Sequence, residues 1–305
     1  MAPSPLRLLL NGKADRAPVD AAIGAVRQLG IRVDVAASEA PGDLARLTRE
    51  ALRDARRGRL ATIVAGGGDG TVNEVFGAAF LEGVPDGCSL AILPLGTAND
   101  FANAAGLPVA DLAACLELAA AGPTARIDLG LLDGRPFVNL LSGGFGSRVT
   151  AETDPELKAR LGGVAYLLAG LSRLGDLAAS RGRVTGEDFV WEGSFISLAI
   201  GNGRTAGGGI PLCPDALIDD GQLDLMILPE LLAPEGPGLA ALLPGVGPGD
   251  SPLLRKARGR WFEYASDEPL HINLDGEPLQ SRHFRVECRP AALPVRLGPS
   301  PLLRR

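Results

Sequence analysis

The sequence predicts an α/β protein of two domains, an N-terminal open and mostly parallel sheet followed by a β-rich, sandwich-like domain. Strand and helix patterns alternate four times within the first 122 residues, which is typical of a parallel sheet covered by helices on both faces. After Pro123 short strands separated by turns replace that rhythm. A chain of 305 residues can supply both cores. We expect domains at residues 1–123 and 124–290, with a tail at 291–305 that packs back on the first.

The elements of the first domain are predicted from short apolar runs, typical of buried strands, that alternate with segments whose apolar residues have helical spacing. Each predicted helix carries apolar residues on one face, and a glycine follows several of them. The predicted strands are residues 6–11, 31–37, 60–66 and 88–96, and the predicted helices are residues 18–30, 42–58, 71–81 and 111–122.

The second domain is predicted from turn signals between short apolar segments. Asp133-Gly134 is a strong signal for a hairpin between two strands. A helical region is expected at residues 155–179, and residues 229–252, rich in Pro and Gly, favour a loop or a broken helix. The remaining strands are expected within residues 183–203, 221–229, 260–279 and 283–290.

Composition excludes several classes of protein. A net charge of −6 argues against broad nucleic-acid binding. The four cysteines form no CxxC pair or ligand cluster, which argues against structural zinc and fits reduced thiols in the cytosol. The N-terminal apolar run is too short for a signal peptide, and prolines interrupt the apolar stretch 231–249, so no transmembrane segment is expected. We expect a cytoplasmic protein.

The stretch "GGGDGT", Gly66 to Thr71, poses a problem of charge. Glycines at a strand-to-helix turn suit an anion, but Asp69 among them should repel one. The stretch does not match the dinucleotide fingerprint, and it lacks the lysine of a P-loop. A tight turn in which Asp69 caps the helix is the simplest alternative.

A second turn of the same kind shifts the balance toward a ligand. "LPLGTANDFA", residues 93–102, also follows a strand and opens a helix. Both turns lie at carboxyl ends of parallel strands, where Thr71 and Thr97 can donate to phosphate oxygens. A divalent cation between Asp69, Asp100 and the phosphates would remove the repulsion. The two turns therefore predict a site for a metal-bound polyphosphate.

These motifs resemble the diacylglycerol-kinase catalytic superfamily, and their order resembles the YegS-type lipid kinases. "GGGDGTVNEV" and "LPLGTANDFA" carry the resemblance together with "LLLNGKA", the segment 143–163, the segment 201–225 and "INLDGEPL". The resemblance implies a two-domain kinase with its active cleft between the domains. It further implies transfer of the γ-phosphoryl group of ATP, with Mg²⁺, to a lipid hydroxyl, phosphatidylglycerol being the associated acceptor.

The resemblance also implies the site residues. Ser38 stands where the family more often has threonine, so a hydroxyl is kept. A structural Mg²⁺ would be held by the Asp220 carboxylate and by the backbone carbonyls of Leu217 and Gln222, although Asp220-Gly221 alone reads as a hairpin turn. The implied nucleotide contacts are Asn11, Gly12, Lys13, Ser38, Gly68, Asp69, Gly70, Thr71, Val72, Asn73, Glu74 and Thr97.

The segment "INLDGEPL" supplies the candidate catalytic carboxylates. Asp275 and Glu277 would share one face if the strand continued through them, or could belong to another turn. Phosphoryl transfer to an alcohol needs a proton acceptor, and His271 lies close in sequence. The resemblance implies Glu277 as that acceptor, with Asp275 close to the transferring phosphate or its metal.

Alternatives and partners remain open. An NAD kinase, a sphingoid or diacylglycerol kinase and a non-catalytic nucleotide sensor are the alternatives. We expect transient contact with phospholipid at a membrane surface, through apolar residues around Leu231–Leu243 and the basic run Arg255–Arg260. The apolar face of residues 166–177 reads first as core and second as an acyl groove. The oligomeric state is not predicted.

Overall fold

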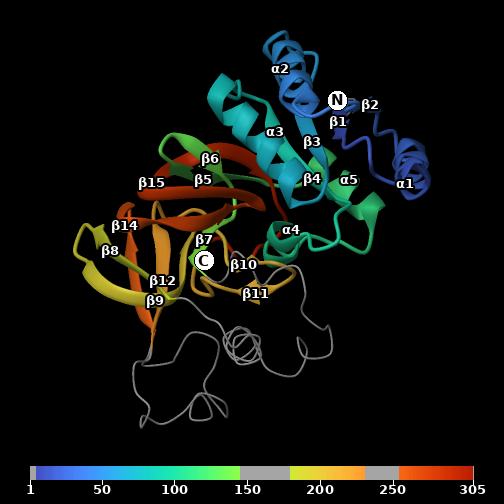
Figure 1. Ribbon diagram of the computed structural model, residues 1–305. Helices are drawn as coiled ribbons and strands as arrows, with labels where there is room; N and C mark the ends of the chain where they lie inside the picture. The colour runs from blue at the N-terminus through green and yellow to red at the C-terminus, as the bar shows by residue number, and fades with distance from the viewer. Residues whose placement is uncertain (1–4, 145–178, 231–253, 305) are drawn as a thin grey trace. The chain divides into compact units, whose positions relative to one another are not determined.

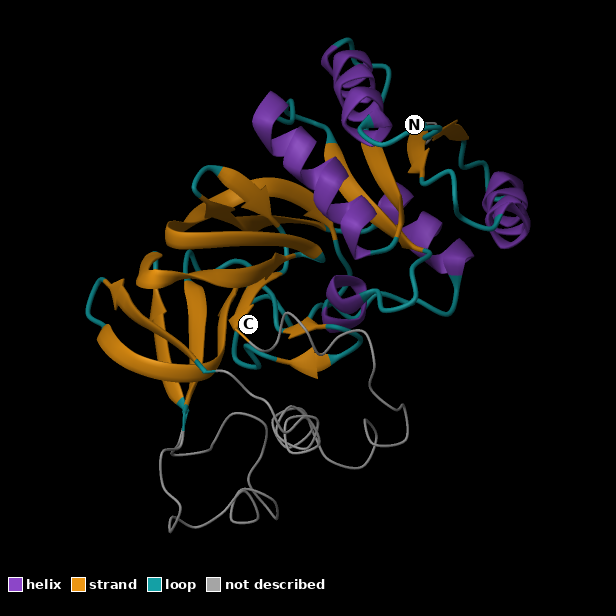
Figure 2. Ribbon diagram, in the orientation of Figure 1, coloured by secondary structure: helices purple, strands orange, loops and turns teal. Residues whose placement is uncertain are grey.

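The computed structural model describes residues 5–144, 179–230 and 254–304, which separate into two compact units (Figure 1). The first unit contains Met1–Leu129, Ile218–Asp220 and Arg289–Arg305, and the second contains Gly130–Leu217 and Gly221–Cys288. All five α-helices of the described residues belong to the first unit (Figure 2). None of these helices is long and apolar enough to span a membrane.

The first unit is built on a parallel sheet with the order β4-β3-β1-β2. Its strands are β1 (Leu6–Leu10), β2 (Val33–Ala37), β3 (Thr62–Gly67) and β4 (Ser89–Pro94). The end of β15 (Glu277–Arg296) joins β4 in parallel through Val295 and Leu90. Every residue of β3 and β4 is buried, which explains why these strands read as continuous apolar runs.

Helices cover both faces of this sheet. They are α1 (Arg16–Gln28), α2 (Asp43–Arg56), α3 (Asp69–Glu82), α4 (Asp100–Ala104) and α5 (Leu112–Ala121). Helices α2 and α3 pack against each other, as α1 and α5 do (Figure 1). Strand β2 lies on one side of β1, and β3 lies on the other. The order in which successive strands are added to the sheet therefore reverses between β1 and β3, although all four strands remain parallel. Ligands of open α/β sheets bind at such a reversal, beyond the carboxyl ends of the strands.

The second unit is an antiparallel sheet with the order β13-β12-β9-β7-β14-β15. Strand β8 also pairs with both β9 and β14, so β7 and β8 fill successive lengths between the same two long strands. The aromatic rings of Phe195, Tyr264 and Phe284 pack together in its core. The remaining strands are β5 (Thr124–Leu132), β6 (Arg135–Phe137), β7 (Leu140–Gly144), β8 (Ser180–Gly186), β9 (Val190–Gly201), β10 (Thr205–Ala206), β11 (Ile210–Pro211), β12 (Leu223–Pro229), β13 (Arg255–Gly259) and β14 (Trp261–Leu274).

The structure confirms the predicted hairpin at Asp133-Gly134 and corrects the one at Asp220-Gly221. Strands β5 and β6 pair across Asp133 and Gly134, which both have positive φ. In contrast, β12 pairs with β9 and β13, and residues 212–222 contain no strand. The Asp-Gly dipeptide therefore lies at the end of an irregular segment. The prediction failed because a turn signal does not show whether a strand precedes the turn.

Three expectations fall largely outside the described residues. These are the helical region 155–179, the apolar face of residues 166–177 and the segment 229–252. Strand β15 runs unbroken from Glu277 to Arg296, so the boundary expected at residue 290 falls inside one strand.

Candidate functional site

Each of the four parallel strands of the first unit is followed, within three residues, by a residue predicted to contact the nucleotide. Asn11 follows β1, Ser38 follows β2, Gly68 follows β3, and Thr97 lies three residues beyond β4. Asn11 links two of these ends, because its backbone N–H donates to the Gly66 carbonyl at 2.8 Å and its Nδ2 donates to Thr71 Oγ1 at 3.0 Å. The carboxyl ends of parallel strands meet at one sheet edge, so these residues share that edge.

The segment after β1 is bound to the end of β2. The Gly12 N–H donates to Ser38 Oγ at 3.1 Å, and a Cβ at Gly12 would collide with the Ser38 carbonyl. Asn11 Oδ1 accepts from the Lys13 N–H at 3.0 Å, while the Lys13 side chain is exposed. The structure thus brings Asn11, Gly12, Lys13, Ser38 and Thr71 together, with the hydroxyl of Ser38 in use as an acceptor.

The start of α3 offers open hydrogen-bond donors. Gly68 is the N-cap and supplies no side-chain acceptor. Among the described residues, the backbone N–H groups of Asp69, Gly70 and Thr71 have no partner, and Gly70 is exposed. The first N–H groups of a helix carry partial positive charge and commonly bind phosphate. The start of α3 is therefore suited to an anion.

The Asp69 carboxylate is occupied by the neighbouring turn. It accepts from the N–H groups of Asp100 at 3.0 Å and Phe101 at 3.1 Å, which are the first two residues of α4. Asp69 therefore caps α4, whereas the alternative from the sequence placed it on its own helix. Its negative charge is balanced by these donors, which resolves much of the repulsion that the sequence posed.

The two glycine turns touch through their backbones. A Cβ at Gly96 would collide with the Cα of Gly68, and one at Gly68 would lie 3.1 Å from the Cα of Gly96. Asn99 fixes the second turn, since its side chain accepts from the Gly96 N–H and donates to the Gly96 carbonyl, both at 2.8 Å. Thr97 is exposed and has no hydrogen bond within the described part of the chain, so its hydroxyl is available to a ligand.

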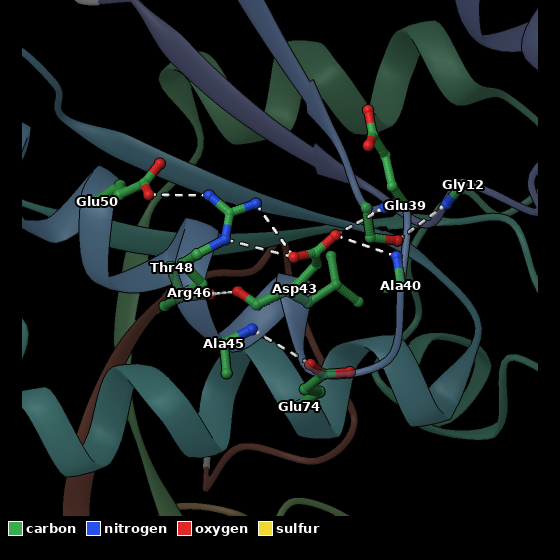
Figure 3. A network of polar contacts seen from close by, with 11 residues as sticks. Gly12, Glu39, Ala40, Asp43, Ala45, Arg46, Thr48, Glu50 and Glu74 are labelled. Carbon is green, nitrogen blue, oxygen red and sulfur yellow. Dashed lines mark hydrogen bonds and ion pairs between the residues drawn. The ribbon is translucent and has the colours of Figure 1, made fainter.

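Three of the predicted nucleotide residues lie further along α3. Val72 is buried in the core, and Glu74 Oε1 accepts from the Ala45 N–H at 3.2 Å near the start of α2 (Figure 3). Asn73 Oδ1 is buried, and no described residue donates to it. The side chains of Val72 and Glu74 thus have structural contacts, and the unsatisfied Asn73 oxygen is buried, so it is not accessible to a ligand in this structure.

A carboxylate also stabilises the turn that follows Ser38. Asp43 Oδ2 accepts from the N–H groups of Glu39 at 2.9 Å and Ala40 at 3.0 Å, and Arg46 pairs with both Asp43 and Glu50 (Figure 3). The two backbone donors, followed by Arg46, hold the pKa of Asp43 below its ordinary value. This network holds the loop between β2 and α2 in place, and with it Ser38.

The catalytic candidates of the second unit lie at a hairpin turn. Leu274 pairs with Glu277, so Asp275 and Gly276, both at positive φ, form a two-residue turn between β14 and β15. The conditional expectation that Asp275 and Glu277 share one face of a continuing strand is wrong, because the strand ends between them.

Asp275 and Glu277 have different surroundings. The Asp275 carboxylate accepts from three consecutive backbone N–H groups, at 2.7 Å from Val138, 3.1 Å from Asn139 and 2.8 Å from Leu140. Glu277 is exposed and forms an ion pair with Arg135. His271 is exposed and its ring contacts the Gln280 amide at 3.1 Å. Asp275 thus organises the backbone, and Glu277 presents its carboxylate to solvent.

The predicted metal ligands Leu217, Asp220 and Gln222 lie in an irregular segment that is tied down by backbone bonds. The Ile218 N–H donates to the Leu302 carbonyl at 2.9 Å, and the Ile218 carbonyl accepts from the Asp128 N–H at 2.6 Å. Asp220 is half-buried, and it and the two carbonyl oxygens are the hard ligands that Mg²⁺ prefers. Within the described residues no cluster of three His, Cys, Asp or Glu side chains could hold a metal. The donor set therefore fits Mg²⁺ only as one carboxylate, that of Asp220, supplemented by backbone oxygens and water.

Comparison with known proteins shows which family the chain belongs to. The sequence profile of the diacylglycerol kinase catalytic domain matches residues 5–132, and that of the YegS C-terminal NAD kinase beta sandwich-like domain matches residues 139–297. A protein of Xanthomonas euvesicatoria pv. vesicatoria (strain 85-10), named probable lipid kinase YegS-like, is 48% identical over 314 residues that cover 99% of each chain. The chain belongs to the YegS-like family and is a kinase.

Other relatives agree with this assignment. A protein of the same name from Pseudomonas aeruginosa (strain UCBPP-PA14) is 49% identical over 300 residues, 97% of this chain and 96% of that one. The crystal structure of a diacylglycerol kinase from Bacillus anthracis str. Sterne matches with a TM-score of 0.73 over 98% of each chain, at 18% identity. Another structure from that organism matches with a TM-score of 0.76 over 98% of this chain and 97% of that one, at 22% identity. At these identities the structures show the shared fold.

The structure adds two residues to the candidate site of this YegS-like kinase that the sequence motifs did not single out. Asn99 braces the second glycine turn, and Arg135 pairs with Glu277. Asn99 was visible as the fourth residue of "GTAND", and its positive φ is typical of Asn. Arg135 directly follows the Asp133-Gly134 turn, but its neighbour is 142 residues away in sequence, so no local pattern could have revealed the pair.

Proposed function

We propose that this kinase transfers the γ-phosphoryl group of ATP to a hydroxyl group of a lipid, with phosphatidylglycerol as the first acceptor to test. The observation that carries the proposal is the start of α3, where three backbone N–H groups are open and the nearest carboxylate, Asp69, is already bound to α4. Such a start can hold the phosphates of a nucleotide. The curated relatives are named probable lipid kinases, which supports the lipid acceptor.

The nucleotide is proposed to lie along the carboxyl edge of β1, β3 and β4. The open N–H groups of Asp69 to Thr71, the exposed Lys13 and the free hydroxyl of Thr97 are the groups available to its phosphates. A bound Mg²⁺ would neutralise the charge that develops on these oxygens. A second, structural Mg²⁺ is proposed at Asp220 with the carbonyl oxygens of Leu217 and Gln222.

The acceptor side of the reaction is assigned to the second unit. Glu277 is proposed to accept the proton of the lipid hydroxyl, because its carboxylate is exposed and no backbone donor occupies it. Asp275 is proposed to keep the turn and the segment 138–140 in place. Transfer requires the two sets of residues to meet in a cleft between the domains, and this meeting is part of the proposal.

Access to a lipid is proposed to occur by transient contact with a membrane surface. The basic run Arg255–Arg260 lies on β13, the edge strand of its sheet, and ends one residue beyond it. Three of its cations already pair with acidic groups, Lys256 with Asp215, Arg258 with Asp224 and Arg260 with Glu187. Its attraction to anionic lipid is therefore weakened, and the apolar residues around Leu231–Leu243 remain the larger part of this proposal.

The experiment is transfer of labelled γ-phosphate from ATP, with Mg²⁺, to phosphatidylglycerol, diacylglycerol, sphingosine and NAD. We expect label on a lipid, and a loss of about 10²- to 10⁴-fold in turnover for Glu277→Gln, the range for a general base. Glu192→Gln is the matched control, because Glu192 is an exposed carboxylate of the same unit that pairs with Arg183. Label on NAD alone would overturn the lipid proposal. ATP binding without transfer to any of these acceptors would instead support a nucleotide sensor.

A further inference from the structure

Arg135 and Glu277 form an exposed ion pair at the proposed acceptor site. The side chains are 49% and 60% exposed, and neither has another polar partner among the described residues. Exposed pairs of this kind contribute little to stability, since both ions remain hydrated. The pair is therefore free to separate when a better partner for either ion arrives.

The backbone that carries Arg135 is held on both sides. Before it, Asp133 exchanges two bonds with Arg285 of β15: the Asp133 N–H donates to the Arg285 carbonyl, and Asp133 Oδ1 accepts from the Arg285 N–H, both at 2.9 Å. After it, the segment 138–140 donates three N–H groups to Asp275. Two Asp-Gly turns, each with positive φ at both residues, are thus fixed to one another. The Arg135 backbone is rigidly placed beside Glu277, while its side chain remains exposed.

A paired guanidinium opposes the proposed chemistry of Glu277. A cation next to a carboxylate stabilises its charged form and so disfavours uptake of a proton. In the transfer, the lipid hydroxyl gives its proton to the carboxylate, its oxygen bonds to the γ-phosphorus, and the bond from that phosphorus to the β–γ bridging oxygen breaks to release ADP. The carboxylate accepts that proton more readily once Arg135 has moved away.

We propose that Arg135 selects the acceptor: its guanidinium binds the phosphodiester of an anionic phospholipid and thereby leaves Glu277 free to accept the proton. Arginine binds phosphate through two parallel hydrogen bonds, a stronger arrangement than an exposed ion pair. In a phospholipid with a glycerol headgroup, one small glycerol unit joins the reactive hydroxyl to the phosphodiester. A neutral diacylglycerol has no such anion, so it leaves the ion pair intact. This inference rests on the proposed lipid-kinase function and adds the residue that reads the headgroup.

The test compares two acceptors in detergent micelles with the full-length protein. Phosphatidylglycerol and diacylglycerol are presented at equal mole fraction, with oleate added to the diacylglycerol micelles to match surface charge. For Arg135→Ala we expect kcat/KM to fall about 10- to 100-fold on phosphatidylglycerol, the range for a hydrogen bond to a charged group. On diacylglycerol we expect kcat/KM to stay the same or to rise, because the substitution also removes the ion pair that holds Glu277. Arg135→Lys should restore part of the loss, since it keeps the charge but not the fork. Arg16→Ala is the matched control, because Arg16 and Asp20 form a pair that is 51% and 57% exposed.

A soluble probe separates headgroup binding from attraction to the micelle. Glycerophosphoglycerol, the headgroup without acyl chains, should inhibit the parent and not Arg135→Ala, and glycerol should inhibit neither. An equal loss on both acceptors would overturn the inference, because it would mean that Arg135 only positions Glu277. An unchanged rate on phosphatidylglycerol, or a parent that labels diacylglycerol alone, would also overturn it while leaving the lipid-kinase function standing. A parent that labels no lipid would overturn both.

Discussion

Replacement of Asp69 by alanine should destabilise the ligand-free protein as well as reduce its activity. The structure gives Asp69 two backbone donors, the N–H groups of Asp100 and Phe101, at 3.0 and 3.1 Å. Loss of a helix cap costs about 0.5–2 kcal/mol, and hydrogen bonds to a charged group add to that, so we expect a loss of about 1–3 kcal/mol. For a chain of this size that corresponds to a Tm lower by about 2–5 °C.

Calorimetry without nucleotide or Mg²⁺ measures this effect, and the labelled-ATP assay measures turnover. Asp111→Ala is the control, because Asp111 caps α5 through a single bond to the Ala114 N–H at 3.0 Å. It should lower Tm by about 1–3 °C and leave turnover unchanged. Asp69→Asn, which keeps one oxygen acceptor, should lie between Asp69→Ala and the parent. An Asp69→Ala protein that melts like the parent but is inactive would refute the capping role and return Asp69 to the metal or the phosphates.

Four further predictions follow from single contacts. Asp275→Asn should lower the free energy of unfolding by about 2–4 kcal/mol, measured in urea, because one carboxylate oxygen facing residues 138–140 becomes a donor; an unchanged urea midpoint would argue for a purely catalytic role. Asp220→Ala should lower Tm and abolish any rise of Tm with Mg²⁺, and melting like the parent at all Mg²⁺ concentrations would contradict the proposed metal site. The lowered pKa of Asp43 stabilises the fold above its ordinary value of 3.8 and is lost as the pH falls through the lower folded-state pKa, so the Tm difference between the parent and Asp43→Asn should shrink in acid. Gly96→Ala should abolish ATP binding in calorimetric titration, since the added methyl group would meet the Cα of Gly68, and normal binding would show that the turns can separate.

Local patterns predicted the strands and helices of the first unit because each of them has its own periodicity and its own stop signal. The buried runs 62–67 and 89–94 could be found from composition alone, since a parallel sheet covered on both faces needs apolar residues at every position. The sequence also predicted that the two glycine turns, after β3 and β4, would lie at the carboxyl ends of parallel strands. That follows from strand direction, without knowledge of any side-chain contact. Asn11 and Ser38, after β1 and β2, were implied only by the family resemblance.

Long-range pairing limited the prediction elsewhere. The Asp220-Gly221 dipeptide looked like a hairpin because Asp-Gly between apolar segments is a strong turn signal. The same dipeptide does form hairpins at 133–134 and 275–276, but β12 pairs with β9 and β13 instead of with a strand directly before residue 220. The role of Asp69 was missed for a similar reason. Its carboxylate oxygens accept hydrogen bonds from a turn that begins 31 residues later, at Asp100. Sequence reasoning looks for a cap only on the helix that directly follows the capping residue.

The partners of the motif carboxylates indicate which of them can do chemistry. Asp69 accepts two backbone N–H groups, Asp275 accepts three, and Glu74 accepts one. A backbone donor is fixed by the fold, so these carboxylates are held as structural anions. Glu277 differs from all three, because its partner is the exposed side chain of Arg135, which can rotate away. A base must exchange its hydrogen-bond partner for the proton of the substrate, and of these four carboxylates Glu277 does so at the smallest structural cost. The proposed assignment of Glu277 as base and of Asp275 as organiser of the turn therefore rests on their hydrogen-bond partners rather than on their distance apart.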